Sequence, residues 1–400
     1  MILSEASVPS FPLVSMQMVT NVRHEWVGVA VNFEKNRTDN IKAFTRLYDE
    51  IGLGDALGDF LCVLEASDLD RVDMDLIADL PRKLVVFRVP AANGAAADAR
   101  ENLDHLQAQG FHIMLDGWPI TDAALPAGVH SLAIGCDQIH KNETPFWQTR
   151  LAGPHLATGV NSLNCFDACR AAGFNWFLGN YPLYPSAGTQ RNEGPSRSRL
   201  LNLLALVARD AESRELERLM TQDPALSYNL LKLVSTATYA RSCAIGSFSQ
   251  AINVLGRRQL QRWLQLLLYA HQGGGDGVNP LLPIAAMRAG LMEALCQKMG
   301  GDRHEADRAF MVGMFSLLDV LFGTPLAEIL EPLHLPDDVL NALQTRSGRL
   351  GAMLDLTEQA CSGNLPLLQE SLNACGIDAE IFCRALVHAC AWAIQVSRTD

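Results

Sequence analysis

The hydrophobic pattern of this chain changes near residue 190, and this change limits the possible folds more than any other feature of the sequence. Before it, short apolar runs rich in β-branched residues alternate with stretches of helical periodicity. Strands are expected at residues 13–19, 27–33, 60–64, 84–89, 112–115, 131–134 and 155–160. Helices are expected at residues 39–51, 97–109 and 164–172. Such alternation is typical of parallel strands with crossover helices, arranged as an open sheet or as a (β/α) barrel.

The length of this first half constrains the barrel. Roughly 185 residues is short for a complete eight-fold barrel, so trimmed helices or a missing unit are expected. A segment dense in Gly, Pro and Ser follows, and it predicts a linker. We therefore place an α/β domain, an incomplete barrel, at residues 1–187 and a linker at residues 188–197.

Residues 198–400 are expected to form an all-α domain, because almost every segment there has helical periodicity. The breaks fall at Asp223-Pro224, at the three glycines 273–275 and at Leu335-Pro336. An Asp before a Pro suits a helix start, since the carboxylate accepts from free amides and Pro gives up an N–H that has no partner. The fold class is thus α/β followed by all-α.

Composition indicates a well-packed protein and excludes some partners. The chain has 400 residues, 48% hydrophobic and 19% charged, with a net charge of −12. A negative surface argues against nucleic acid and anionic membranes as partners, because contact with phosphate needs positive charge. The first residues lack the basic segment of a signal peptide, and no apolar run approaches the ~20 residues of a membrane span. We therefore expect a cytoplasmic protein.

Ten cysteines are spread along the chain without any Cys-x-x-Cys motif. Cys165 and Cys169 lie four residues apart, which places both on one face of a helix. Reduced core cysteines are the expectation here, in preference to a metal site or a disulfide.

Two segments of the helical half have distinctive sequence motifs. Residues 222–226 read Gln-Asp-Pro-Ala-Leu, and residues 250–256 read Gln-Ala-Ile-Asn-Val-Leu-Gly after the capping-box spacing Ser247-x-x-Gln250. This stretch resembles the HDOD family, non-catalytic relatives of the HD phosphohydrolases found in bacterial signalling proteins. The resemblance is dense over residues 200–269 and looser to residue 350. It implies a helical domain that transmits signals through protein contacts.

The histidine positions also indicate a non-catalytic domain. An HD phosphohydrolase needs an adjacent His-Asp pair among its metal ligands, and none of the ten histidines here is followed by Asp. The nearest approach is His304-Glu305, which we expect at a helix start, with Asp302 as the cap and His304 exposed.

Three arginines mark a candidate interaction surface in this half. Arg257, Arg258 and Arg262 cluster at an expected helix start beside Trp263. Arg and Trp are frequent at interface hot spots, and positions four apart share a helix face. The alternative is an exposed basic face with Trp263 in the core.

The first half is similar at both ends to the EAL domain, a barrel that hydrolyses cyclic di-GMP with divalent metals. Gln17-Met18-Val19 lies where that family has Gln-Pro-Ile, and Gly28 lies at the family's Gly before its Glu-Ala-Leu motif. Residues 166–179 follow the family's closing helix and strand. The whole chain thus resembles an EAL–HDOD fusion with a degenerate EAL domain.

The resemblance implies a loss of chemistry. Aligned position by position, the family's metal and catalytic residues fall on Ala30, Cys62, Arg88, Asp116, Gly117, Ala133, Thr158, Asn161 and Leu178. Of the metal-binding and water-activating groups only Asp116 remains, and one carboxylate cannot hold two divalent cations. A fixed Arg88 charge would repel a dication by several kcal/mol at low effective dielectric. The expectation is a pseudoenzyme with no catalytic residue, no metal and no cofactor.

Two other uses of the barrel remain open. Carboxylates near expected strand ends could form a substitute metal site, or could be solvated loop charges; they are Glu34, Glu65, Asp116 and Asp137. A cyclic dinucleotide could bind with Arg88 facing a phosphate and with Trp118 or Trp176 stacking on a base.

Three hypotheses follow from the sequence. The first is a non-catalytic regulatory protein of bacterial signal transduction that acts by binding other signalling proteins, with a second copy of the chain as a further candidate partner. The second is a cyclic-dinucleotide receptor that binds its ligand without hydrolysis. The third is a metal-dependent phosphodiesterase with a relocated site.

Overall fold

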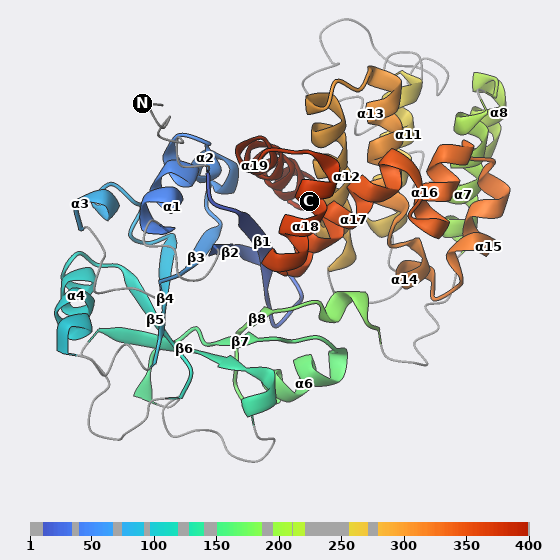
Figure 1. The fold of residues 1–400 in the computed structure, drawn as a ribbon. Coiled ribbons are helices and arrows are strands. Elements are labelled where there is room, and N and C mark those ends of the chain that lie inside the picture. Colours follow the sequence, from blue (N-terminus) through green and yellow to red (C-terminus); the bar gives the residue numbers. More distant parts are fainter. Residues whose placement is uncertain are drawn as a thin grey trace, which may run out of the picture.

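A computed structural model of the chain describes most of both halves. The described residues are 11–33, 40–66, 74–91, 97–118, 128–139, 150–185, 195–209, 211–220, 256–270 and 279–398. A β-barrel with short helices forms the first half, and a helical assembly forms the second (Figure 1).

The first half is a closed barrel of eight strands in the order β1 to β8. The strands are β1 (Val14–Asn21), β2 (Trp26–Phe33), β3 (Leu61–Glu65), β4 (Val85–Pro90), β5 (His112–Asp116), β6 (Val129–Gly135), β7 (Leu156–Thr158) and β8 (Trp176–Leu178). Strand β1 is antiparallel to both β2 and β8, and every other neighbouring pair is parallel. The seven expected strands are confirmed. Of the two expected consequences of the short length, a missing strand is not found, because the three-residue β8 closes the barrel.

The helices around the barrel are short, as the length of this half predicted. They are α1 (Asn40–Asp49), α2 (Leu53–Leu57), α3 (Met74–Ile77), α4 (Ala97–Ala108) and α6 (Leu163–Ala171). Three of them match the expected helices at residues 39–51, 97–109 and 164–172. A closed barrel therefore fits into the available length because its described helices are short and its last two strands have only three residues each.

One apolar side chain from each strand fills the inside of the barrel. This apolar plug consists of Val19, Ala30, Val63, Val86, Met114, Ala133, Leu156 and Leu178. On each strand, the residues next to the plug residue face outward and join the main hydrophobic core. Because side chains alternate along a strand, residues two positions beyond the plug point inward again. Those positions form the mouth of the barrel, at the carboxyl ends of its parallel strands.

The second half is all-α in its described parts. Its helices are α7 (Pro195–Ala208), α8 (Ser213–Met220), α11 (Arg257–Ala270), α12 (Leu281–Lys298), α13 (Arg303–Phe315), α14 (Leu318–Phe322), α15 (Leu326–Leu330), α16 (Asp337–Thr345), α17 (Gly348–Ser362), α18 (Leu365–Cys375) and α19 (Ala379–Ser397). Helix α12 is the central element: it is buried almost throughout and packs against α13 and α19.

Several predicted helix boundaries are confirmed. Asp302 caps α13 in a capping box with Glu305, and His304 is exposed. Helix α16 begins directly after Leu335-Pro336. Helix α7 begins at Pro195, inside the predicted linker, with Pro at the helical position that needs no N–H. The predicted features at 222–226, 247–250 and 273–275 lie outside the described residues.

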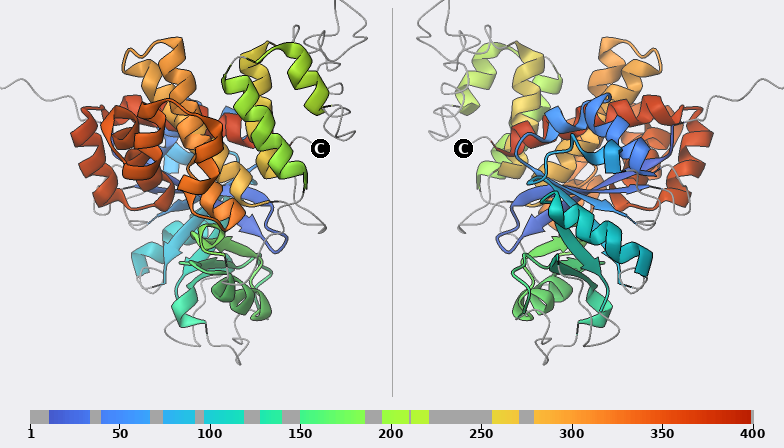
Figure 2. Two further views of the ribbon diagram at one scale, coloured as in Figure 1. Left: turned by 90° about the vertical axis from the view of Figure 1, so that its right-hand side faces the viewer. Right: turned by 90° about the vertical axis from the view of Figure 1, so that its left-hand side faces the viewer.

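The last three helices lie between the barrel and the rest of the helical half (Figures 1 and 2). Helix α17 packs on β1, and α19 packs on α2 and β1. Arg46 of α1 is 3.0 Å from Glu380 of α19, and Arg398 is 3.6 Å from Asp59. One hydrophobic core runs through both halves. The domain division at residues 187 and 198 stays a prediction.

Among the described helices, α19 is long and apolar enough to be considered as a membrane span. Half of that stretch is buried inside the protein, where it packs against α12 and α2. This packing favours a core helix, and the cytoplasmic location stays a prediction.

The crossing of α12 and α13 depends on a glycine. A Cβ on Gly313 would lie 2.5 Å from the backbone of Ala289, so Gly313→Ala forces the two helices apart. We expect Gly313→Ala to lower the free energy of unfolding by roughly 1–3 kcal/mol, as overpacking does. Gly290→Ala is the matched control, because its Cβ would meet its nearest atom at 3.3 Å. Chemical denaturation of both variants checks this, and equal stabilities would contradict it.

Barrel stability should depend on the protonation of His112. Burial, followed by the nearby His130 and His155, lowers the pKa of His112 from 6.5 to about 4. The folded protein therefore resists protonation that the unfolded chain accepts. The contribution of His112 is fully present above about pH 6.5 and is lost as the pH falls toward 4.

We expect the melting temperature to fall between pH 7.5 and pH 5, and to fall less steeply in His112→Asn. His388→Asn, on the exposed face of α19, is the control and should leave the slope unchanged. Thermal unfolding followed by circular dichroism measures both. An unchanged slope in His112→Asn would show that this side chain does not carry the effect.

Candidate functional site

A ring of polar side chains surrounds the mouth of the barrel, directly above the apolar plug. Its members come from six strands: Gln17, Asn32, Glu65, Arg88, Asp116 and Thr158. All of them line a cavity of about 1060 Å³. In (β/α) barrels the carboxyl ends of the strands are where binding and catalytic groups gather. This polar ring is therefore the candidate site.

Arg88 is the cation of the polar ring and pairs with both of its carboxylates. Its Nη2 donates to Glu65 Oε2 at 2.5 Å, and its Nε lies 3.3 Å from Asp116 Oδ2. The Arg88 side chain is 10% exposed, and Asp116 is 33% exposed. The Nε–H is buried and makes no hydrogen bond of good geometry within the described residues. A guanidinium with a spare donor is a recognised group for binding phosphate.

The helical half supplies one wall of the cavity. Ser362, Gly363 and Asn364 line it at the turn between α17 and α18, and Gln369 and Glu370 line it from α18. The first turn of α18 therefore faces the ring, and a helix N-terminus carries partial positive charge that favours an anion. The mouth is thus enclosed by both halves of the chain.

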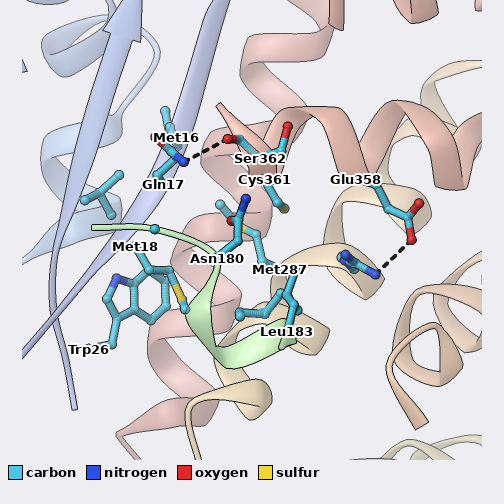
Figure 3. A pocket seen from close by; sticks show the side chains of 14 residues that line it. Met16, Gln17, Met18, Trp26, Asn180, Leu183, Met287, Glu358, Cys361 and Ser362 are labelled. Atoms are coloured by element: carbon cyan, nitrogen blue, oxygen red, sulfur yellow. Dashed lines mark hydrogen bonds and ion pairs between the residues drawn. The ribbon is translucent and has the colours of Figure 1, made fainter. Parts of the chain in front are cut away.

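A hydrogen bond ties this wall to the barrel. Gln17 Nε2 donates to the carbonyl oxygen of Ser362 at 2.9 Å (Figure 3). Gly363 has φ +78°, and a Cβ there would lie 2.6 Å from the Gln17 side chain. Only glycine suits both the conformation and the space. A ligand that enters the mouth therefore meets a closely fitted contact between β1 and the α17–α18 turn.

A second cavity lies in the seam between the halves, next to the ring. It holds about 50 Å³ and is bordered by Met18, Trp26, Leu183 and Met287, with the Arg288–Glu358 ion pair at its edge (Figure 3). A volume of this size admits a few water molecules. The mouth, about twenty times larger, is the better place for a ligand.

The predicted ligand residues are brought together only in part. Arg88 and Asp116 meet in the ring as an ion pair. Trp118 packs against the main hydrophobic core, and Trp176 begins β8 and packs against the apolar plug. Neither is among the residues that line the cavity.

The predicted substitute acidic site is formed only at two positions. Glu65 and Asp116 flank Arg88 in the ring. Asp137 is exposed on the turn that follows β6 and is not part of the cavity lining. Glu34 lies outside the described residues.

The positions aligned with the family's ligands lie in different layers of the barrel. Ala30, Ala133 and Leu178 belong to the apolar plug, one layer below the ring. Cys62 faces outward, where burial raises the pKa of its thiol and Cys390 of α19 lies close. The alignment gave too little weight to the oxygen-bearing side chains of the ring. Alternation along β2 and β3 was the signal that could have identified Asn32 and Glu65.

The ring does not fit two divalent cations as it is arranged. Arg88 lies between the two carboxylates and pairs with both, so a cation that binds them would have to displace or approach the guanidinium. Within the described parts of the chain, the one group of ligands close enough together for an ion is Cys136, Cys165 and Cys169, away from the ring. We therefore derive no chemical step through a metal at the mouth.

The predicted interaction arginines are used inside the helical half. Arg258 and Arg262 of α11 both pair with Glu293 of α12 and with Asp307 of α13. Arg262 also stacks over the Phe310 ring, at 4.2 Å. These contacts join three helices, and a role of Arg258 and Arg262 in a partner surface stays a prediction.

The remaining members of that cluster are similarly occupied. Arg257 donates to the carbonyl oxygen of Ala211 at 2.6 Å, and Trp263 packs against the main core. Trp263 is thus partly buried, and the choice between a partner surface and an exposed basic face stays open.

Comparison with known proteins supports the helical domain and the overall relationship. A family model for the HDOD domain matches residues 198–322, which confirms that domain. Cyclic di-GMP phosphodiesterase CdgJ of Vibrio cholerae is 30% identical over 335 residues, 80% of this chain and 75% of that protein. The uncharacterized protein YuxH of Bacillus subtilis is 30% identical over 178 residues, 42% of this chain and 43% of that protein.

Solved structures resemble the chain more distantly. The EAL enzyme Bd1971 bound to cGMP has a TM-score of 0.35 at 13% identity, over 42% of this chain and 59% of that one. BlrP1 of Klebsiella pneumoniae, in complex with calcium and cy-diGMP, has a TM-score of 0.35 at 12% identity, over 42% and 54%. No inference rests on these two likenesses.

The expectation of a pseudoenzyme is corrected by the Vibrio protein. A relative of 30% identity over 80% of the chain is named a phosphodiesterase, which points to an enzyme. Of the aligned positions, Ala30, Ala133 and Leu178 lie in the apolar plug, whereas Arg88, Asp116 and Thr158 belong to the polar ring.

Proposed function

The chain belongs to the family of the cyclic di-GMP phosphodiesterase CdgJ, and on that premise we propose that its barrel mouth binds and hydrolyses cyclic di-GMP. The observation that carries this proposal is Arg88, held between Glu65 and Asp116 on the floor of a cavity of about 1060 Å³. In this proposal the helical half, with its HDOD domain, binds other signalling proteins differently when the mouth holds a ligand.

The size and charge of the mouth support a cyclic dinucleotide. Pockets for small ligands usually hold about 300–1000 Å³, so this cavity takes a molecule larger than a mononucleotide. The two phosphates of the ligand need cationic and N–H donors. Arg88 offers a guanidinium, and the first turn of α18 offers a partial positive charge.

Ligand binding would change the ion pairs that Arg88 makes with Glu65 and Asp116. A phosphate that takes the guanidinium of Arg88 replaces Glu65 or Asp116 as its partner. The released carboxylate can then accept a proton from a water molecule, which is the role of a general base in hydrolysis. Asp116 suits this role better than Glu65, because it is the more exposed and lies on the weaker of the two contacts.

The wall from the helical half is the proposed route of the signal. Gln17 belongs to the ring and also bonds Ser362, so a ligand that moves Gln17 also moves the α17–α18 turn. The turn is the end of α17, and α17 packs on α12. Helix α12 in turn packs on α13, which lies in the HDOD region.

Loss of Arg88 should weaken binding of cyclic di-GMP. Charge-assisted hydrogen bonds contribute about 1.5–3 kcal/mol, so Arg88→Ala should raise the Kd by about 10-fold or more. Arg88→Lys, which keeps the charge without the planar fork, should have a smaller effect. Isothermal titration calorimetry measures each Kd.

Arg170→Ala is the control for this comparison, since Arg170 lies on α6 with half of its side chain exposed. Circular dichroism should confirm that Arg88→Ala is folded, because the substitution removes a cation that two carboxylates share. A folded Arg88→Ala protein with unchanged affinity would contradict the assignment of the ring.

Removal of the proposed base should reduce turnover without abolishing binding. Asp116→Asn should lower kcat by about 100-fold, the usual range for a general base, while the Kd changes little. The measurement is chromatography of the linear dinucleotide product, with and without added Mg²⁺ or Mn²⁺. Asp137→Asn, an exposed aspartate outside the cavity, should behave as the wild type. Binding by the wild-type protein without any product would refute the hydrolytic part alone.

A further inference from the structure

Three cysteines gather outside the mouth cavity, between the turn after β6 and helix α6. Cys136 begins the short 3₁₀ turn after β6, and Cys165 and Cys169 lie on successive turns of α6. The three sulfur atoms all lie within 4.8 Å of one another. Cys136 and Cys165 are joined as a disulfide, with 6.5 Å between their Cα atoms, and the Cys169 thiol lies buried beside them.

Local sequence holds these residues in place. Ser162 caps α6 by accepting from the backbone N–H of Cys165 at 3.2 Å. Cys165 is therefore in the first turn of the helix, and Cys169 follows on the same face. Gly135 ends β6, and Cys136 opens the short turn that follows it. The cluster is built from two fixed elements, not from a loose loop.

The third sulfur distinguishes this cluster from a simple disulfide. A disulfide uses two sulfurs, and a third within 4.8 Å of both has no part in it. A thiophilic ion uses all three: in a tetrahedral zinc site with Zn–S bonds of about 2.3 Å, the sulfurs lie roughly 3.8 Å apart. Cys136 and Cys165 are half-buried, so an ion can reach them from solvent, while Cys169 closes the inner side.

We propose that Cys136, Cys165 and Cys169, when all three are reduced, bind one thiophilic metal ion of the Zn²⁺ type. Three protein ligands leave a fourth position for water or another donor. The ion would join the turn after β6 to α6. The segment that leads into α6 contributes Thr158, Gly159 and Asn161 to the wall of the mouth, so the ion would also stabilise that wall. This site does not depend on the proposed hydrolysis.

Burial has a consequence for how the ion is taken up. Burial raises the pKa of the Cys169 thiol to about 11, so this thiol is protonated at neutral pH in the absence of metal. Binding of an ion replaces that proton, as is usual for thiolate ligands.

The test uses the metal alone on the full-length protein, reduced with a phosphine under anaerobic conditions. Co²⁺ serves as a spectroscopic probe for Zn²⁺. The expected result is one equivalent of Co²⁺ with a thiolate-to-cobalt charge-transfer band that disappears when Zn²⁺ is added. Cys136→Ser and Cys169→Ser should each weaken binding by at least about 10-fold, the effect expected for loss of a ligand. Cys375→Ser, on α18 outside the cluster, is the control and should bind as the wild type.

A second measurement does not rely on variants. Zn²⁺ should protect these three cysteines from alkylation in the reduced wild-type protein, as seen by mass spectrometry of its peptides. Absence of the charge-transfer band in the fully reduced protein would overturn the proposal. So would Co²⁺ binding of equal affinity in Cys169→Ser, or alkylation of the three cysteines that Zn²⁺ does not slow.

Discussion

The ion pairs of Arg88 with Glu65 and Asp116 organise the mouth of this barrel. All three side chains come from neighbouring strands and lie above an apolar plug, where each charge is stable only with a partner. The arrangement leaves a net negative charge, because one guanidinium faces two carboxylates. An anionic ligand that binds Arg88 therefore competes with a carboxylate. This competition links binding at the mouth to the state of the groups that could activate water.

The helical half takes part in this site. Its α17–α18 turn lines the mouth, and its last helix packs along the barrel. The fit between Gly363 and Gln17 leaves no space for even a methyl group. A chain in which one half closes the binding cavity of the other can couple ligand occupancy to the arrangement of its helices, because both share one packed core.

Much of the fold followed from local patterns, and the errors have definite causes. Seven strands and the helix start at Asp302 were predictable, because alternation, helical periodicity and capping act over a few residues. Strand β8, three residues long, was too short to show a period of its own. The place of Ala30 and Ala133 in the apolar plug was not predictable, because the depth of a residue inside the barrel depends on the stagger of all eight strands. The prediction of a pseudoenzyme is contradicted by the relationship to a named phosphodiesterase.

The sequence by itself determined the two-part architecture, the HDOD domain and the presence of Arg88 and Asp116 near strand ends. Only the tertiary structure decided that Glu65 joins them, that Trp118 lies elsewhere and that Arg258 and Arg262 hold helices together. The reason is physical: periodicity reports which face of an element is buried, but not which element covers it. Closure of the barrel and docking of the last three helices selected the residues that meet at the mouth.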